Sequence, residues 1–185
     1  MKTINDLRLL LAALVFTTMG VFVHAQKPDA PPRYKDVVVD NPNAEADMKV
    51  LGDFSNALAA GDAAKLKSLM GDKFMMYGPS AADSSNAEQY VKGWVEGGFK
   101  NSTDRKVGFV TQTFKVLKGD LAGAWVSQWG DYTFTQEGKT IKVPFQCTAR
   151  IADGKIANAR IYFDNTYILK QLGYKVTPPE TMSKN

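Results

Sequence analysis

Four long segments with the composition of β-strands follow one another in the second half of this chain, and they constrain its fold more than any other feature. They are rich in Val, Ile, Thr and aromatic residues, the types that suit a pleated sheet. The segments are Lys106–Leu117, Leu121–Thr135, Thr140–Ile151 and Ile156–Ile168. Only short turns separate them, and such turns join antiparallel neighbours. At about 12 residues each, the strands are longer than usual and must coil and bend. The sequence therefore predicts a strongly bent antiparallel sheet.

Three helices are expected before this sheet. Asn43 is a candidate cap for the first helix, Gly61 ends it, and Asp62 is placed to cap the second. Ser85-Asn86-Ala87-Glu88 fits a capping box that starts the third helix, which then stops at Gly97-Gly98. Helices followed by an antiparallel meander are typical of an α+β domain. We expect the three N-terminal helices to pack in the concavity of the bent sheet, which gives a cone-shaped α+β barrel with an apolar interior.

The first 25 residues have the pattern of a secretory signal peptide. Lys2 and Arg8 give a positive start, the apolar run Leu9–Val23 follows, and Val23-His24-Ala25 places small residues at the exit. The run of about 15 residues is shorter than the roughly 20 that span a bilayer as a helix. We therefore expect cleavage before Gln26 and export to the periplasm or beyond. An uncleaved membrane anchor is the alternative.

Removal of this segment excludes several kinds of chemistry. The only histidine of the chain, His24, leaves with it, so the mature chain has no Ser-His-Asp relay and no histidine-ligated metal. The single cysteine, Cys147, cannot build a thiolate site and is expected to be buried. The formal net charge of the full chain is only +4, and no basic run alternates with aromatic residues. We therefore expect no metal, no cofactor, no nucleic acid partner and no membrane contact after cleavage.

The order of elements and the closing segment carry a family resemblance. Tyr162-Phe163-Asp164 followed by Leu169-Lys170-Gln171-Leu172-Gly173, with Phe74–Gly78 as a first strand, resembles the nuclear transport factor 2-like superfamily, and most closely its SnoaL-like branch. The superfamily includes isomerases, cyclases, dehydratases, epoxide hydrolases and many non-catalytic binding domains. The resemblance therefore implies the fold and a cone-shaped cavity rather than one function.

The resemblance covers roughly residues 44–174 and suggests where the domain begins and ends. We expect a signal peptide at residues 1–25, a proline-rich linker at 26–43, the SnoaL-like domain at 44–175 and a flexible tail at 176–185.

Two carboxylates are candidates for chemistry. In enzymes of this superfamily an aspartate inside the cone often acts as acid or base, and Asp164 matches the aspartate that closes the last strand in many SnoaL-like sequences. By strand alternation, Arg160, Tyr162 and Asp164 share one face, and Trp129 and Asp131 share a face of a neighbouring strand. If both faces point inward, Asp131 and Asp164 approach one another over the cavity. Otherwise Asp164 caps the closing helix and Asp131 is a solvated strand residue.

Six further residues are candidates for contact with a ligand: the tryptophans could form a platform, Arg160 could hold an anion, and Tyr77 and Gln146 could point polar tips into a pocket. They are Tyr77, Trp94, Trp129, Gln146, Tyr162 and Arg160. The alternatives are core packing or a dimer surface for the tryptophans, a surface ion pair for Arg160, and ordinary strand positions for the others.

Three functions remain open at this point. The first is a secreted SnoaL-like domain that binds a small, largely apolar molecule in its cone-shaped cavity. The second is a cofactor-free acid/base enzyme of the cyclase, isomerase or dehydratase type that uses Asp164 with Asp131. The third is a structural or interaction module that forms a homodimer through the outer face of the sheet.

Overall fold

The computed structural model describes residue 31, residues 33–175 and residue 177. The expected signal peptide lies outside the described residues, as do the first part of the expected linker and nearly all of the expected tail. Residues from Arg33 onward belong to one compact unit. Within the described part of the chain, no helix is long and apolar enough to cross a membrane.

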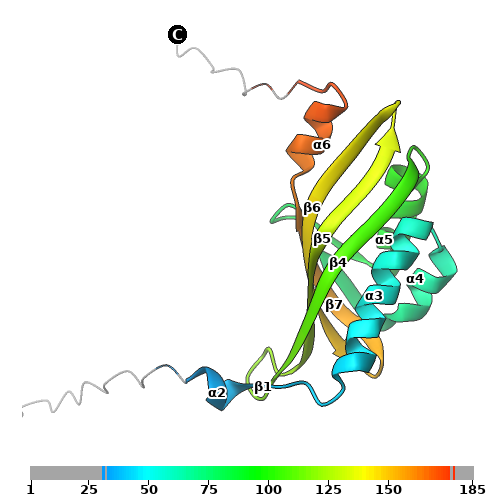
Figure 1. Ribbon diagram of the computed structural model, residues 1–185. Coiled ribbons are helices and arrows are strands. Elements are labelled where there is room, and N and C mark those ends of the chain that lie inside the picture. Colours follow the sequence, from blue (N-terminus) through cyan, green and yellow to red (C-terminus); the bar gives the residue numbers. More distant parts are fainter. Residues whose placement is uncertain (1–30, 32, 176, 178–185) are drawn as a thin grey trace, which may run out of the picture. The chain divides into compact units, whose positions relative to one another are not determined.

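The described residues form one bent sheet of seven strands in the order β1-β4-β5-β6-β7-β2-β3 (Figure 1). The strands are β1 (Val38–Val39), β2 (Met70–Tyr77), β3 (Ser84–Asn86), β4 (Thr103–Val116), β5 (Gly123–Gln136), β6 (Lys139–Ala152) and β7 (Lys155–Phe163). The four predicted long segments are β4 to β7, and each pairs antiparallel with the next. The pairing of β2 with β7 is parallel, so the sheet is mixed rather than wholly antiparallel. Parallel neighbours need a long connection, and here α5 and the whole meander supply it.

Helices α3, α4 and α5 lie on one face of this sheet, and α6 packs beside β6 (Figure 1). The helical segments are α2 (Tyr34–Val37), α3 (Ala44–Ala60), α4 (Ala63–Leu69), α5 (Ala87–Lys92), the π-helical η1 (Gly93–Phe99) and α6 (Asn165–Gln171). As predicted, α3 ends at Gly61, whose positive φ of 71° suits glycine. Asp62 caps α4 by accepting a hydrogen bond from the backbone N of Lys65 at 2.9 Å. The predicted α+β cone with helices against a bent sheet is confirmed.

Two helix starts differ from the prediction. The capping box of α5 is one residue further along: Asn86 Oδ1 accepts from the backbone N of Gln89 at 2.9 Å, and Gln89 Oε1 accepts from the backbone N of Asn86 at 3.0 Å. Ser85 cannot be the cap because it is still in β3, where it pairs with Met76. Asn43 makes no side-chain cap on α3.

The core lies between the helices and the concave face of the sheet. Its main cluster joins α3, α4 and the central strands, with Leu51, Phe54, Leu66, Phe74, Met76, Val126 and Ile156 among its most buried side chains. A second, smaller cluster, Phe134, Ile141 and Val143, lies beneath Ile168 and Leu172 at the C-terminal end of the fold. Residues of both clusters reach the cavity described next, so this cavity lies where the two parts of the core meet.

Candidate functional site

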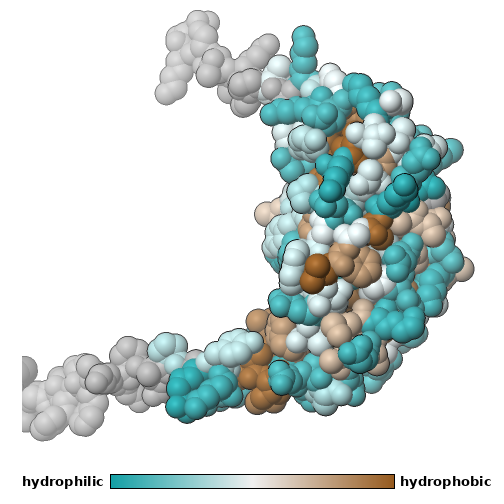
Figure 2. Space-filling model, in the orientation of Figure 1, coloured by the Kyte–Doolittle hydropathy of each residue, from teal (hydrophilic) through white to brown (hydrophobic). Residues whose placement is uncertain are grey.

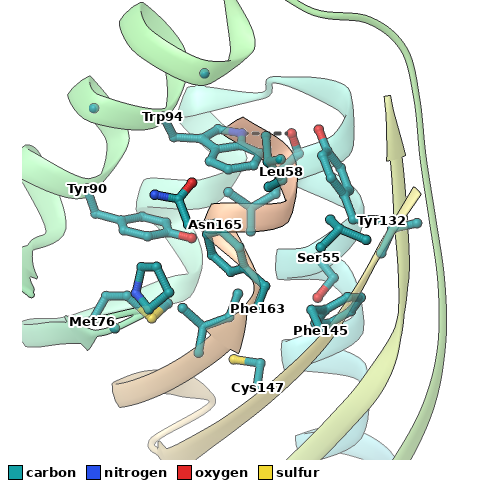
Figure 3. Close-up of a pocket in the computed structure, with 18 of the residues that line it drawn as sticks. Ser55, Leu58, Met76, Tyr90, Trp94, Tyr132, Phe145, Cys147, Phe163 and Asn165 are labelled. Atoms are coloured by element: carbon teal, nitrogen blue, oxygen red, sulfur yellow. Dashed lines mark hydrogen bonds between the residues drawn. The ribbon is translucent and has the colours of Figure 1, made fainter. Parts of the chain in front are cut away.

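A cavity of about 420 Å³ lies between α3, α5 and the concave face of the sheet, with α6 contributing to its wall (Figure 3). Pockets that hold small organic ligands span about 300–1,000 Å³. Seven aromatic side chains contribute to its largely apolar wall, namely Phe54, Tyr90, Trp94, Tyr132, Phe134, Phe145 and Phe163. The cavity is therefore large enough, and apolar enough, for a small organic molecule.

The lining of the cavity carries no formal charge. Among the described residues that form it there is no Asp, Glu, Lys, Arg or His. The polar members are uncharged amides and hydroxyls: Ser55, Ser85, Gln89, Ser102, Gln136 and Asn165, besides the two tyrosines. In such surroundings a charged ligand would lose its hydration without gaining a partner of opposite charge. The wall thus favours neutral ligands.

Among the polar groups of the wall that are already hydrogen-bonded to the protein, those of Ser55 and Trp94 join separate elements. The Ser55 hydroxyl donates a hydrogen bond to Gln128 Oε1 at 2.5 Å, which ties α3 to β5. The Trp94 indole Nε1 donates to the backbone carbonyl of Leu58 at 3.0 Å, which ties η1 to α3 (Figure 3). Both bonds fix the walls of the cavity, so the hydrogens that they use are not free for a ligand.

Three titratable groups in the wall stay protonated at neutral pH. Burial is the main cause that raises the pKa of Tyr90 above its ordinary value, and the nearby Cys147 and Tyr132 add to the effect. Burial also raises the pKa of Tyr132 to about 12, against a smaller opposing effect of the Arg105 guanidinium. The Cys147 thiol, predicted and found to be buried, has its pKa raised by burial to about 12. The site therefore offers neutral hydroxyls and a neutral thiol, but no reactive thiolate.

Of the residues expected to contact a ligand, Trp94 lines the cavity and the others lie on the opposite face of the sheet. Trp129, Gln146 and Tyr162 stand in one row across β5, β6 and β7, and Trp129 and Tyr162 are 42% and 49% exposed. In the next row, the Arg160 guanidinium lies 5.3 Å from the centre of the Tyr77 ring. These five residues belong to the outer face, where they cannot reach a molecule in the cone.

The two candidate carboxylates also lie away from the cavity. Asp131 forms a salt bridge with Lys142 at 2.9 Å on the outer face, where its side chain is 44% exposed. Asp164 is exposed and caps α6, since its Oδ1 accepts a hydrogen bond from the backbone N of Tyr167 at 2.8 Å. Neither borders the cavity, so the structure does not bring them together over a bound molecule. The alternation that puts them outside places Tyr132 and Phe163 inside.

The outer face of the sheet exposes several large apolar side chains to solvent. Val110 pairs with Trp129 on this face and is 58% exposed, and Val39, Leu117 and Leu121 are also exposed. Figure 2 shows apolar residues gathered in more than one place on the face that it draws, among hydrophilic ones.

Apart from Trp94, the aromatic residues of the cavity wall are not among the ligand contacts predicted from the sequence. One signal could have found them: the strand positions that carry no charge, Tyr132 and Phe134 on β5 and Ile161 and Phe163 on β7, are the ones that face the cavity.

A comparison of the sequence with protein families settles the relationship. Residues 48–152 match the family profile of the SnoaL-like domain. The chain belongs to the SnoaL-like family. The resemblance expected from the closing segment is thereby confirmed. No curated protein matches this SnoaL-like sequence significantly.

Solved structures agree with this assignment. A proposed SnoaL-like polyketide cyclase from Shewanella denitrificans is similar over 68% of this chain and 96% of its own, with 12% identity and a TM-score of 0.55. IdmH, a proposed polyketide cyclase from Streptomyces antibioticus, covers 69% and 99% with 18% identity and a TM-score of 0.55. PrhC from Penicillium brasilianum covers 69% and 86% with 11% identity and a TM-score of 0.58. At these identities the likeness shows the nuclear transport factor 2-like fold of this SnoaL-like domain and not its function.

Proposed function

We propose that this SnoaL-like domain binds a small, uncharged, largely apolar molecule in the cavity between its helices and its sheet. One observation carries the proposal: the described lining of a 420 Å³ cavity is largely apolar, includes seven aromatic side chains, and holds no Asp, Glu, Lys, Arg or His. Catalysis by Asp164 with Asp131 has no comparable support, because both carboxylates serve contacts outside the cavity.

The energetics of such a site follow from its wall. Apolar surface removed from water contributes about 25 cal/mol per Å². A ligand that buries about 200 Å² therefore gains roughly 5 kcal/mol before the costs of ordering and of lost translation are subtracted. An anion of the same shape would also lose its hydration and find no cation in the wall.

A matched pair of fluorescent probes tests the proposal. N-phenyl-1-naphthylamine and 1-anilinonaphthalene-8-sulfonate share one ring system and differ by the sulfonate. We expect the neutral probe to bind with an increase in fluorescence. The sulfonate should bind at least about 10-fold more weakly, because a desolvation cost of about 1.4 kcal/mol that no contact compensates raises the Kd tenfold. Equal affinity for the two probes would contradict the proposal.

Two tryptophan variants locate the binding. Leu58 lines the cavity, whereas Val110 is exposed on the outer face. Leu58→Trp should fill part of the cavity and weaken binding of N-phenyl-1-naphthylamine, while Val110→Trp, which adds the same indole outside, should leave it unchanged. If Val110→Trp weakens binding and Leu58→Trp does not, the probe binds the outer face and the cavity is not the site.

We also propose that the protein is exported to the periplasm or beyond and that it binds its ligand there. It is supported by the charge, apolar run and small-residue exit at residues 1–25. Bacterial expression of the full chain, fractionation and intact-mass measurement should give a periplasmic or secreted protein that begins at Gln26. A protein that retains Met1 would contradict it.

A homodimer through the outer face is the corresponding proposal for assembly. The exposed Val110 and Trp129, paired on β4 and β5, and the exposed Tyr162 on β7 support it. Light scattering should give twice the monomer mass, and Trp129→Glu should halve it because a carboxylate would be buried in the interface. A monomeric protein at micromolar concentration would contradict the dimer.

A further inference from the structure

We propose that the Tyr90 hydroxyl is the hydrogen-bond donor by which the cavity selects its ligand, and that this ligand carries a neutral acceptor oxygen, such as a ketone carbonyl, on an apolar skeleton. This inference rests on the proposed function, because it concerns the same cavity. It goes further by naming the recognition residue and the chemical group that this residue recognises.

The position of the Tyr90 side chain is fixed by its neighbours. Its ring stacks on Phe54 at 5.9 Å between centroids and meets Phe74 edge-on at 6.0 Å. The next residue, Val91, is buried in the core, and the capping box of Asn86 and Gln89 holds the start of the same helix. Figure 3 shows the ring reaching from α5 with its hydroxyl end directed into the cavity. The oxygen is therefore held at a defined place before any ligand arrives.

The Tyr90 hydroxyl is not used by the protein. Among the described residues it has no hydrogen-bond partner, whereas Ser55 and the Trp94 indole, which share the wall, donate to Gln128 and to the carbonyl of Leu58. A tyrosine hydroxyl that is removed from bulk water normally has a partner. A ligand in the cavity can supply that partner.

The chemistry of the wall determines which partner fits. Burial keeps Tyr90 protonated, and the nearest titratable groups that act on it, Cys147 and Tyr132, are neutral as well. The hydroxyl therefore has a hydrogen to donate, and a ligand that accepts it satisfies this hydrogen. A carboxylate could accept too, but no cation in the described lining compensates the burial of its charge. A neutral carbonyl oxygen satisfies the donor without that cost.

Tyr132 is the rival donor in the same wall. Its hydroxyl also has no hydrogen-bond partner among the described residues, but the positive charge of Arg105 acts on it. Its ring comes from β5 and contacts Trp94 and Phe134, whereas the Tyr90 ring comes from α5 and contacts Phe54 and Phe74. Because the two hydroxyls arise from different walls, variants can tell them apart.

Competition between two tricyclic probes tests the inference. 9-Fluorenone and fluorene share one flat ring system, and only the former has a carbonyl. Each is titrated against bound N-phenyl-1-naphthylamine in the wild-type protein and in Tyr90→Phe, which removes one oxygen and keeps the ring. We expect fluorenone to bind more tightly than fluorene to the wild type. The ratio of the two Kd values should fall about 3- to 10-fold in Tyr90→Phe, the range of one neutral hydrogen bond.

A matched control makes the same chemical change outside the cavity. Tyr77 lies on the outer face against Arg160, and Tyr77→Phe should leave the ratio at its wild-type value. If the ratio is unchanged in Tyr90→Phe while N-phenyl-1-naphthylamine still binds, the inference is overturned and the proposed function stands. If Tyr132→Phe lowers the ratio instead, recognition belongs to Tyr132 and the inference is also overturned. If N-phenyl-1-naphthylamine does not bind the wild type, the proposed function itself fails.

Infrared spectroscopy provides a test that needs no variant. The carbonyl stretch of fluorenone bound to the wild-type protein should lie at lower wavenumber than in an alkane, because a hydrogen bond weakens the C=O bond. A stretch at the alkane position would overturn the inference even if Tyr90→Phe did not fold.

Discussion

The hydrogen bond between Ser55 and Gln128 is predicted to stabilise the fold, because it joins two walls of the cavity. It joins α3 to β5 across 73 residues of sequence with an Oγ–Oε1 distance of 2.5 Å. Gln128 is 0% exposed, and its Nε2 also donates to Thr111 Oγ1 at 3.3 Å. Ser55→Ala leaves Gln128 Oε1 buried without a partner, which costs about 1–3 kcal/mol. In a domain of this size, a loss of 2 kcal/mol lowers Tm by roughly 4–8 °C.

A double-mutant cycle separates this bond from other effects of the substitutions. Urea denaturation is measured for Ser55→Ala, for Gln128→Met and for the two together. Since Gln128→Met removes the acceptor that Ser55→Ala leaves unpaired, the double variant should be more stable than the sum of the single losses by about 1 kcal/mol or more. Ser68→Ala, at an exposed serine, should change stability by less than about 0.5 kcal/mol. Additive losses, or a Ser55→Ala loss as small as that of Ser68→Ala, would refute the reasoning.

Three further predictions concern single residues. Gly78 has a φ of +99°, and an added Cβ would lie 2.1 Å from the Ile161 carbonyl oxygen, so Gly78→Ala should lower Tm more than Gly119→Ala, where φ is +83° but nothing lies within 4 Å. Asp164→Ala should cost about 1 kcal/mol in urea denaturation because α6 loses its cap, and Asp164→Asn should cost almost nothing since asparagine caps equally well. The pKa of Cys147 rises on folding from 9.0 to about 12, so the free energy of unfolding should fall as pH rises from 9 toward 12, by up to about 1.4 kcal/mol per pH unit. Cys147→Ala should remove that part of the slope.

The local features of the fold could be predicted because their causes are local. Gly61 ends α3 since a residue at positive φ favours glycine, and Asp62 caps α4 since its carboxylate reaches the third amide of the helix. The parallel pairing of β2 with β7 was missed because it depends on the path of the chain over about 80 residues, which no short pattern records. The capping box was misplaced by one residue because Ser85 is needed in β3, a tertiary pairing that outweighs its preference for a cap.

The candidate site was harder to predict than the fold. Side chains alternate between the two faces of a strand, but this alternation does not show which face the helices cover. Trp129 and Asp131 on β5, and Arg160 and Tyr162 on β7, were favoured for their chemistry, and the structure places all four outside. The physical reason is the cost of burying charge: Asp131 and Arg160 would have lost hydration beneath the apolar faces of α3 and α5. The charge-free positions of the same strands can be covered at no such cost, so they are the ones that the helices enclose.

The cost of burying charge also limits the chemistry that is possible inside the cavity. The helices enclose the sheet face that carries no charge. Only uncharged groups of that face are therefore available to bind a ligand. In the described lining those are amides, hydroxyls and one buried thiol, and of them the Tyr90 hydroxyl combines a fixed ring with an unused hydrogen. A proton transfer in this cavity would have to use a group whose pKa burial has moved further from neutrality, which works against general acid or base catalysis near pH 7. The physical chemistry that builds the cone therefore favours selective binding over acid/base chemistry inside it.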